Sequence, residues 1–265
     1  RYSVNHAISV NSNTSGLIAA MGAVGISPGD EVILPAWSMS ATAMAPIFYG
    51  GIPVFADVEA ETFCIDAERV EHSITPKTRA IIAVNLFGHP AQLSRLRAIA
   101  DAHEIYLIED NAQAPLGEEH NRLTGTIGHI GVFSLNYHKH IQTGEGGVCV
   151  TNDADLALKL QLIRNHGENL IDTHEIEMPI NLIGFNFRMT ELSAAIGIQQ
   201  LLNVDRHVSA REGLAKQLTR GVSGLPGIAP PVVRDGCRHN YYVWMARYDS
   251  KTVGVERDVF SQALS

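Results

Sequence analysis

A lysine between two histidines, followed by a cluster of glycines, is the first group in this chain that could do chemistry. It is Lys139, in the stretch SLNYHKHIQTGEGG at residues 134–147. Its amine could attack a carbonyl to form a Schiff base, or the residue could be a bystander in a His-x-His metal site. Because most lysines are solvated surface residues, a chemical role for Lys139 needs partners elsewhere in the chain.

Two further polar clusters stand where functional residues often gather. The stretch NSNTSG at residues 11–16 precedes an apolar helical pattern, and donors at a helix N-terminus form a natural phosphate site. Taken alone, the same stretch could be an ordinary N-cap with extra polar residues. The stretch IEDNAQ closes an apolar strand with Glu109 and Asp110, which alone could equally be turn or capping residues.

Together the three clusters meet the needs of one cofactor, pyridoxal phosphate. This cofactor requires a lysine that forms a Schiff base, a carboxylate that keeps the pyridine nitrogen protonated, and a phosphate site at the start of a helix. Lys139, Asp110 and the 11–16 stretch supply one of each. As a set they favour a single site over three unrelated features.

The elements that must position these clusters follow an alternating pattern. Continuous apolar strands separated by helices predict an α/β fold with a mostly parallel sheet covered on both faces. Residues at the strand ends should then gather at one edge of the sheet. The predicted strands cover 31–36, 52–58, 79–87, 105–110, 131–136 and 146–152, and the predicted helices cover 15–25, 40–49, 91–103, 154–165 and about 190–219.

The composition is that of an ordinary globular protein, with 265 residues of which 45% are hydrophobic and 18% charged. A formal net charge of −8 excludes a general basic surface for nucleic acid or an anionic membrane, while a local anion site is compatible with it. The cysteines Cys64, Cys149 and Cys237 form no C-x-x-C motif, so we expect free, mostly buried thiols in a reducing compartment.

One uncharged stretch, residues 35–56, is long enough to span a membrane. Its three prolines and a pair of glycines break it into pieces of helix and strand length. We therefore expect a buried helix and a buried strand there. No signal peptide pattern is present at the N-terminus, and the expected location is the cytoplasm.

The chain resembles the sugar aminotransferases of the DegT/DnrJ/StrS type, which are pyridoxal phosphate enzymes of fold type I. In this family the reactive lysine stands five residues after the serine of an FS pair and five before the first glycine of GEGG, and Ser134, Lys139 and Gly144 match both intervals. The other matching motifs, in order and correctly spaced, are GISPGDEVILPAWSMSATA, GGIPVFADV, YLIEDNAQA, RNHGE and GFNFRMTELSAAIGIQQL.

The resemblance implies a role for each matching residue. Lys139 corresponds to the lysine that forms the Schiff base, Asp110 to the carboxylate beside the pyridine nitrogen, and Gln113 to the residue beside the ring hydroxyl. A phosphate ligand from the second subunit implies a homodimer with shared active sites. The implied phosphate ligands are Ser134, the amides around Asn13 and Thr14, and Asn186 from the second subunit. Without the resemblance, Asn186 would more simply be a turn residue that caps the following helix.

Three departures from the family pattern concern details of the site. Asn13 stands where relatives usually have glycine, so the loop must admit a side chain. The position that stacks on the cofactor ring, usually aromatic, is Met39, and Trp37 is the alternative, because a thioether can also lie against a ring. Asn85 stands where many relatives have histidine.

The resemblance also implies the domain organisation. Residues 1–210 correspond to the aspartate-aminotransferase-like large domain, which binds the cofactor, and residues 211–265 to the start of a smaller C-terminal domain. Relatives continue beyond both ends of the chain, so we expect a fragment with an incomplete N-terminus and a truncated small domain. The stretch GLPGIAPPVV at 224–233 is interpreted as the connector into that domain.

The implied function is transfer of an amino group from an amino acid, glutamate or glutamine, to a keto sugar linked to a nucleotide, a step of polysaccharide biosynthesis. Pyridoxamine phosphate would be the aminated form of the cofactor. The family also contains dehydratases, in which histidine replaces the lysine, and non-enzymatic regulators. Lys139 in register and an intact Asp110 favour transamination.

Three other interpretations fit the sequence less well. A desulfurase usually needs a catalytic cysteine, and none of the three cysteines lies in a matching motif. A dinucleotide-binding domain is disfavoured because GEGGVC lacks the final glycine of G-x-G-x-x-G and precedes a strand. A metal site at His138 and His140 lacks an apparent third ligand.

Overall fold

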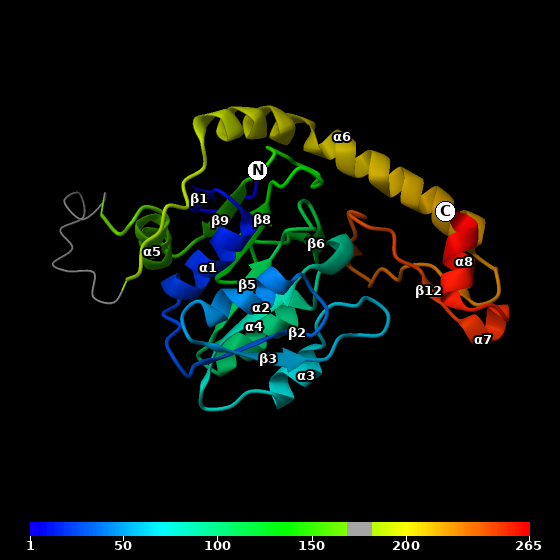
Figure 1. The fold of residues 1–265 in the computed structure, drawn as a ribbon, viewed down its shortest axis with the longest axis horizontal. Coiled ribbons are helices and arrows are strands. Elements are labelled where there is room, and N and C mark those ends of the chain that lie inside the picture. Colours follow the sequence, from blue (N-terminus) through cyan, green and yellow to red (C-terminus); the bar gives the residue numbers. More distant parts are fainter. Residues whose placement is uncertain (169–181) are drawn as a thin grey trace.

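A seven-stranded sheet lies at the centre of the computed structural model, which describes residues 1–168 and 182–265 (Figure 1). The strand order is β1-β9-β8-β5-β4-β2-β3. β9 runs antiparallel to both of its neighbours, and all other neighbouring pairs are parallel. This confirms the predicted α/β fold with a mostly parallel sheet. The strands are β1 His6–Val10, β9 Gly147–Thr151, β8 Ile130–Ser134, β5 Tyr106–Asp110, β4 Thr78–Val84, β2 Glu31–Pro35 and β3 Ile52–Ala56.

Helices cover both faces of this sheet, because successive side chains of each strand point to opposite faces. In β2, Val32 and Leu34 pack into a core with α1, α2 and α5, whereas Ile33 packs into a second core with α3 and α4. We call these the α1 face and the α4 face. The helices are α1 Asn13–Ala23, α2 Ser40–Ile47, α5 Ala154–Arg164, α3 Ala67–His72 and α4 Leu93–Ala102.

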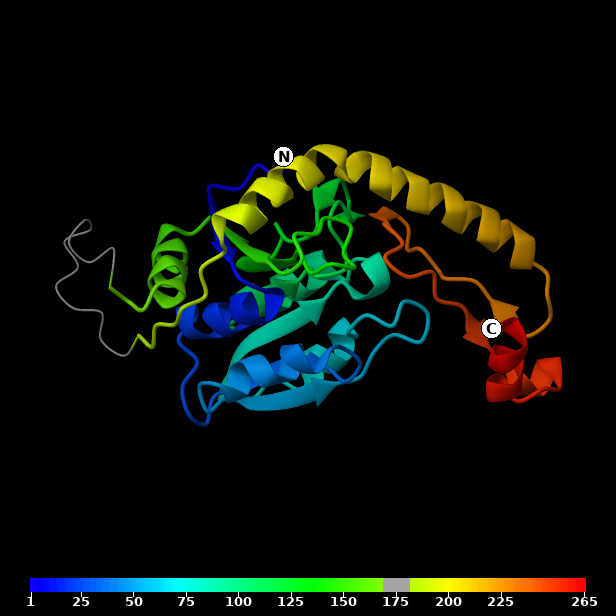
Figure 2. The same cartoon turned by 45° about the horizontal axis from the view of Figure 1, so that its top comes forward.

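A single helix of 32 residues, α6, carries the chain from the sheet to the C-terminal segment (Figure 2). Val204 and Val208 of α6 pack against Leu135 and Ile141, which follow β8. The helix runs without a break through residues 210 and 211, the expected domain boundary. The remaining elements are α6 Glu191–Val222, β10 Ile228–Ala229, β11 Cys237–Arg238, β12 Arg247–Tyr248, α7 Ser250–Val253 and α8 Arg257–Leu264.

The C-terminal segment is attached to the sheet domain by a small second sheet. β11 pairs with β6, Glu118–Glu119, which in turn pairs with β7, Arg122–Leu123. Close packing beside it depends on Gly88, at the end of the short helix η1, Leu86–Gly88. A Cβ at Gly88 would lie 1.9 Å from Asn240 Oδ1, so only glycine lets the C-terminal segment pass at this distance.

All six predicted strands and all five predicted helices are present, with ends that shift by a few residues. The elements that were not predicted are β1 and α3 in the sheet domain, together with the short pieces η1, β6, β7, β10, β11, β12, α7 and α8. The predicted strand 79–87 was too long, because η1 replaces its end. The stretch 35–56 forms α2 and β3, but the expected burial was wrong: β3 is an edge strand, and Ile52 and Phe55 are 46% and 58% exposed.

Two further observations concern the compartment and the membrane. Cys64 and Cys149 are buried, Cys237 is half-buried, and all three thiols are free, as expected. Within residues 1–168 and 182–265, no helix combines the length and the apolar character that a membrane span requires.

Candidate active site

The carboxyl ends of the parallel strands meet at one edge of the sheet, and most of the predicted site residues lie there. Asp110 ends β5 and Ser134 ends β8, while α1 begins at Asn13, directly after the turn that follows β1. A Cβ at Gly147 would lie 2.7 Å from the Ser12 carbonyl, so this glycine lets the turn before α1 lie directly on the start of β9.

Asp110 points to the α1 face and is 4% exposed. Its Oδ2 accepts a hydrogen bond from Thr42 Oγ1 at 3.0 Å. Its Oδ1 accepts from the Ala112 amide at 3.2 Å and from Asn13 Nδ2 at 3.4 Å. Burial raises the pKa of Asp110, while these hydrogen bonds and the positive charge of Lys139 act in the opposite direction. A second cation at this carboxylate would favour its charged form.

Glu109, one residue earlier, points to the α4 face and is fully buried. Its two oxygens accept hydrogen bonds from the backbone amides of Gly125, Ile127 and Gly128 at 2.6–2.7 Å. Asn85 Nδ2 is a fourth donor at 3.2 Å. Burial raises the pKa of Glu109, which these four donors oppose. Both Glu109 oxygens are thus already hydrogen-bonded to N–H groups of the chain.

Lys139 is half-buried in the turn that follows β8. Its backbone amide donates to the Asn136 carbonyl at 2.9 Å. Its Nζ donates to Tyr242 Oη at 3.1 Å and lies 4.3 Å from the centroid of the Tyr242 ring. Its positive charge partly offsets the burial that raises the pKa of Asp110, although the two side chains form no direct ion pair in the part of the chain that the structure describes.

The first turn of α1 presents backbone donors beside Asp110. Ser12 is the N-cap, and its Oγ accepts from the Ser15 amide at 3.0 Å. The amides of Asn13 and Thr14 have no acceptor within the helix, because they belong to its first turn. The Asn13 side chain turns toward the sheet, where its Nδ2 also lies 3.2 Å from the Val132 carbonyl.

Gln113, Trp37 and Met39 border this edge from the loops after β5 and β2. Gln113 Oε1 accepts from the Phe87 amide at 2.6 Å. Trp37 is 47% exposed and packs edge-on against Phe63 and Phe87, with ring centroids 5.1 and 5.9 Å away. Met39 is the N-cap of α2 and is 68% exposed.

Two predicted phosphate ligands make little side-chain contact inside the chain. Ser134 is half-buried, and its Oγ accepts from the Asn136 amide at 3.3 Å. Asn186 is exposed, and its backbone rather than its side chain makes the contacts: its carbonyl accepts from Asn11 Nδ2 at 3.4 Å, and it forms a β-bridge with Asn165. Within residues 1–168 and 182–265 the Asn186 side chain makes no hydrogen bond, and its exposure leaves it accessible to another molecule.

Thr42 and Tyr242 belong to the site but were missed in the sequence. Thr42 is completely buried and holds Asp110, and Ser38 Oγ lies 2.8 Å from its hydroxyl. The only signal for Thr42 was the group of hydroxyl residues in an uncharged stretch. Tyr242 lies 103 positions after Lys139, and nothing in the spacing connects them.

The two histidines beside Lys139 lie in different surroundings. His138 is exposed, and its ring contacts Tyr137 with centroids 4.2 Å apart. His140 is buried, and its Nε2 lies 3.4 Å from the Asn240 carbonyl. Burial lowers the pKa of His140 to about 4. The neutral His140 is therefore part of the packing beneath the Lys139 turn.

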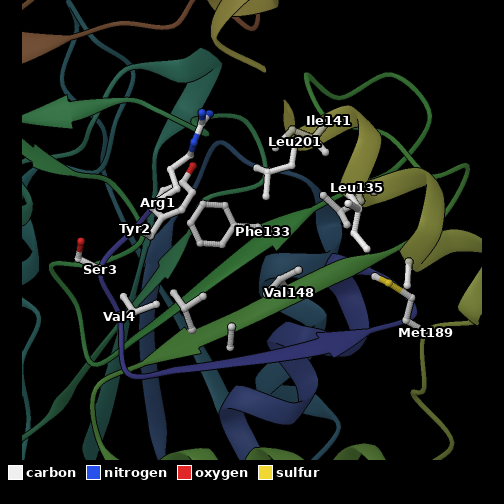
Figure 3. Close-up of a pocket in the computed structure, with 15 residues that line it drawn as sticks. Arg1, Tyr2, Ser3, Val4, Phe133, Leu135, Ile141, Val148, Met189 and Leu201 are labelled. Carbon is white, nitrogen blue, oxygen red and sulfur yellow. The ribbon is translucent and has the colours of Figure 1, made fainter. Parts of the chain in front are cut away.

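An apolar pocket lies elsewhere, between the first half of α6 and the sheet face opposite α1. Its volume is about 420 Å³, and apolar side chains such as Phe133, Val148 and Leu201 line it (Figure 3). Arg1 and Tyr2 lie at one side of it. Since Asp110 points to the other face of the sheet, this pocket is separate from the candidate site.

The arrangement at the edge of the sheet can bind a particular kind of molecule. First-turn amides suit a phosphate, a buried carboxylate suits a cationic ring nitrogen, and a lysine amine can bind a carbonyl covalently. The structure brings Asp110, Asn13 and Thr42 into contact and places Lys139 within electrostatic reach.

Comparisons with known proteins identify the family of the chain. Residues 2–265 match the DegT/DnrJ/EryC1/StrS aminotransferase family. The chain is 35% identical to the spore coat polysaccharide biosynthesis protein SpsC of Bacillus subtilis, over 98% of this chain and 68% of that protein. It is 38% identical to GDP-perosamine synthase of Caulobacter vibrioides, over 92% of this chain and 65% of that protein.

A solved structure agrees with these relatives. The X-ray structure of DesV from S. venezuelae superposes with a TM-score of 0.90 at 33% identity, over 99% of this chain and 68% of that chain. The chain thus spans about two thirds of the length of the proteins that it matches. On this evidence, the chain belongs to the DegT/DnrJ/EryC1/StrS aminotransferase family.

Proposed function

We propose that the protein is a pyridoxal phosphate-dependent aminotransferase, which moves an amino group from glutamate or glutamine to a keto sugar linked to a nucleotide. The observation that carries the proposal is the contact of the buried Asp110 carboxylate with the first turn of α1, at the sheet edge where Lys139 follows β8 and its charge acts on Asp110. The names of the relatives, a polysaccharide biosynthesis protein and GDP-perosamine synthase, support a sugar acceptor.

The residues at this edge fit pyridoxal phosphate. Asp110 is a buried carboxylate whose charged form needs a cation, and a protonated pyridine nitrogen is one. The amides of Asn13 and Thr14 can bind a phosphate at the positive end of α1, to which the Ser134 hydroxyl adds a donor.

Each residue then has a defined task. When bound, pyridoxal phosphate withdraws electrons from the amino donor, which makes transfer of the amino group possible. Asp110 keeps a proton at the ring nitrogen through its negative charge. Lys139 would hold the cofactor covalently and, once its amine is released, Nζ would carry a proton between two positions of the reacting molecule. Gln113 would be the residue beside the ring hydroxyl.

Met39 is the better candidate for the residue that lies against the cofactor ring. Trp37 is already engaged edge-on with Phe63 and Phe87. Met39 is more exposed, stands at the start of α2, and carries a polarizable thioether that can contact an aromatic face.

Transamination is preferred over the two other activities of the family. A dehydratase would have histidine where Lys139 stands, and here the histidines flank that position. A non-enzymatic regulator has no need of the Asp110 and Thr42 hydrogen bond beside a reactive amine.

A product assay tests the proposed function. The full-length protein is mixed with pyridoxal phosphate, glutamate or glutamine, and a panel of nucleotide-linked keto sugars, and the products are analysed by mass. We expect one acceptor to gain an amino group as the donor loses its own. If the donor is consumed and no sugar is aminated, the sugar acceptor is wrong. If neither changes, the transaminase assignment is wrong.

We further propose a homodimer in which Asn186 reaches the phosphate bound by the partner chain. The exposed Asn186 side chain and the exposed apolar residues of the first half of α6, Leu192, Ile196 and Leu202, support this arrangement. We also propose that residues 1–210 and 211–265 belong to two domains, and that the protein acts in the cytoplasm.

Mixed dimers test the shared site. Lys139→Ala and Asn186→Ala subunits are each prepared and then mixed under conditions that allow exchange. In a shared site both lesions fall in one active site of the mixed dimer and the other stays intact, so activity should recover toward half of the wild-type value. If Asn186 acts within its own chain, each site carries one lesion, and mixing restores nothing.

A further inference from the structure

The contact between Lys139 and Tyr242 is the most direct interaction of the reactive amine. Nζ lies 3.1 Å from Tyr242 Oη and 4.3 Å from the ring centroid, so the amine meets both the hydroxyl and the ring face. A phenol oxygen and an aromatic face each attract an ammonium group. Both parts of the Tyr242 side chain therefore act on the same atom.

Tyr242 is held in this position from two sides. Its amide donates to Asn240 Oδ1 at 3.1 Å, and its carbonyl accepts from Arg211 of α6 at 3.1 Å. Asn240 is completely buried, and its Nδ2 donates to the Pro115 carbonyl at 2.8 Å. The Tyr242 backbone is thus fixed both to the loop after β5 and to α6.

The same segment also contacts the loops that border the site. The Val243 amide donates to the Phe87 carbonyl at 3.1 Å, and the Phe87 amide donates to Gln113 Oε1. The residue after Tyr242 is therefore linked through Phe87 to Gln113, a residue of the candidate site. A loose surface tyrosine would have none of these attachments.

We infer that Tyr242 is a positioning residue for the reaction, which holds Nζ of Lys139 whenever the amine is not bonded to the cofactor. The inference rests on the proposed function, because it concerns where the amine lies after it has left the cofactor and before it carries a proton. Lys139 has four rotatable side-chain bonds, and a free amine without a partner would spread over many positions. Docking on Tyr242 confines it to one.

The test measures the reactivity of Lys139 in the full-length chain after removal of cofactor. Tyr242→Phe removes the hydroxyl and keeps the ring, so it should fold. Tyr241→Phe is the matched control, because Tyr241 stacks on His239 rather than meeting Lys139. Each protein is acetylated briefly with acetic anhydride at one pH, and the label on Lys139 is compared by peptide mass with that on the exposed Lys77.

We expect Tyr242→Phe to raise the relative label on Lys139 by about three- to tenfold, the effect of losing one hydrogen bond, and Tyr241→Phe to leave it unchanged. Equal labelling of Tyr242→Phe and the wild type would overturn the inference. Turnover with cofactor and substrates gives a second readout. Tyr242→Phe should lower kcat by about tenfold and leave the acceptor KM unchanged.

The two readouts separate this inference from the proposed function. If the wild type aminates no sugar but the label on Lys139 rises in Tyr242→Phe, the amine is docked as inferred and only the proposed reaction fails. If the wild type is active and Tyr242→Phe matches it in both labelling and kcat, only the role of Tyr242 is wrong.

Discussion

Two carboxylates stand side by side at the end of β5, and their surroundings differ completely. Glu109 points to the α4 face, where three backbone amides and Asn85 supply four hydrogen bonds. Asp110 points to the α1 face, where Thr42, Asn13 and a backbone amide bind it and the Lys139 charge reaches it. Both are buried, and burial raises the pKa of both.

The difference shows that burial alone does not identify a reactive carboxylate. Glu109 closes a turn, because its partners are amides of residues 125–128 that need an acceptor. Asp110 instead contacts the first residue of α1, and the charge of Lys139 acts on it; a cationic ligand would be stabilised at this carboxylate. The alternation of side chains along a strand is what separates the two roles.

The largest expected effect on turnover comes from removing the Lys139 amine. Lys139→Ala should lower turnover by more than about a thousandfold, because in the proposed function this residue both binds the cofactor and moves the proton. Borohydride reduction of the wild type with bound cofactor, followed by peptide mapping, should place a covalent label on Lys139. A label on Lys77, Lys159, Lys216 or Lys251 instead would contradict the assignment.

The next effect concerns Asp110 itself. Asp110→Asn should lower turnover by about a hundred- to a thousandfold, since an amide cannot hold the ring proton by charge. The melting temperature at pH 7 should not fall. The raised pKa means that the neutral form is the more stable one when folded, so the gain from protonation is present at low pH and lost as pH rises through the folded pKa. Near-normal turnover would mean that another group holds the proton.

The same acid-to-amide change at Glu109 should lower stability, although burial raises the pKa of Glu109 as well. Both Glu109 oxygens face N–H donors, whereas the Thr42 hydroxyl beside Asp110 can turn to accept from an amide. In Glu109→Gln an NH₂ group would face backbone amides that need an acceptor, which costs about 2 kcal/mol of unfolding free energy. Urea unfolding of the two amide variants, measured side by side, makes the comparison direct. A Glu109→Gln protein as stable as Asp110→Asn would show that the two carboxylates are equivalent.

The smallest effect is expected at Thr42. Thr42→Val keeps the shape and removes the hydroxyl that donates to Asp110, a loss of about three- to tenfold in turnover. Because that hydrogen bond lowers the pKa of Asp110, its loss should move the acid limb of the pH–activity profile to higher pH. Ser38→Ala, which removes a hydroxyl one contact further away, is the control and should show a smaller displacement.

The sequence predicts the parallel sheet well, because its strands are continuous apolar segments whose pattern is local. β1 was missed because HAISV is a short segment with two polar residues, and it becomes a strand only by pairing with β9, about 140 positions away. The exposure of β3 was missed for a related reason. Its position at the edge of the sheet depends on strand order, which composition does not reveal.

For the candidate site, the sequence yields the residues that begin or end an element. Asp110, Ser134 and Asn13 fall into this class: the structure places the first two at strand ends and Asn13 at the start of α1. Thr42 and Tyr242 could not be predicted, because their roles depend on contacts across 68 and 103 positions of chain. The assignment of each site residue to cofactor binding stays a prediction that the variants above test.

Because α6 is unbroken, the number of residues in it fixes where its later side chains lie. Its 32 residues span about 48 Å, and about two thirds of the way along it Arg211 binds the Tyr242 carbonyl while Glu212 pairs with Arg238. Inserting one residue upstream, for instance after Leu202, would advance both side chains by about 1.5 Å and turn them by about 100° out of phase. Surface substitutions along α6 leave that phase intact, so the helix can change its composition far more freely than its length.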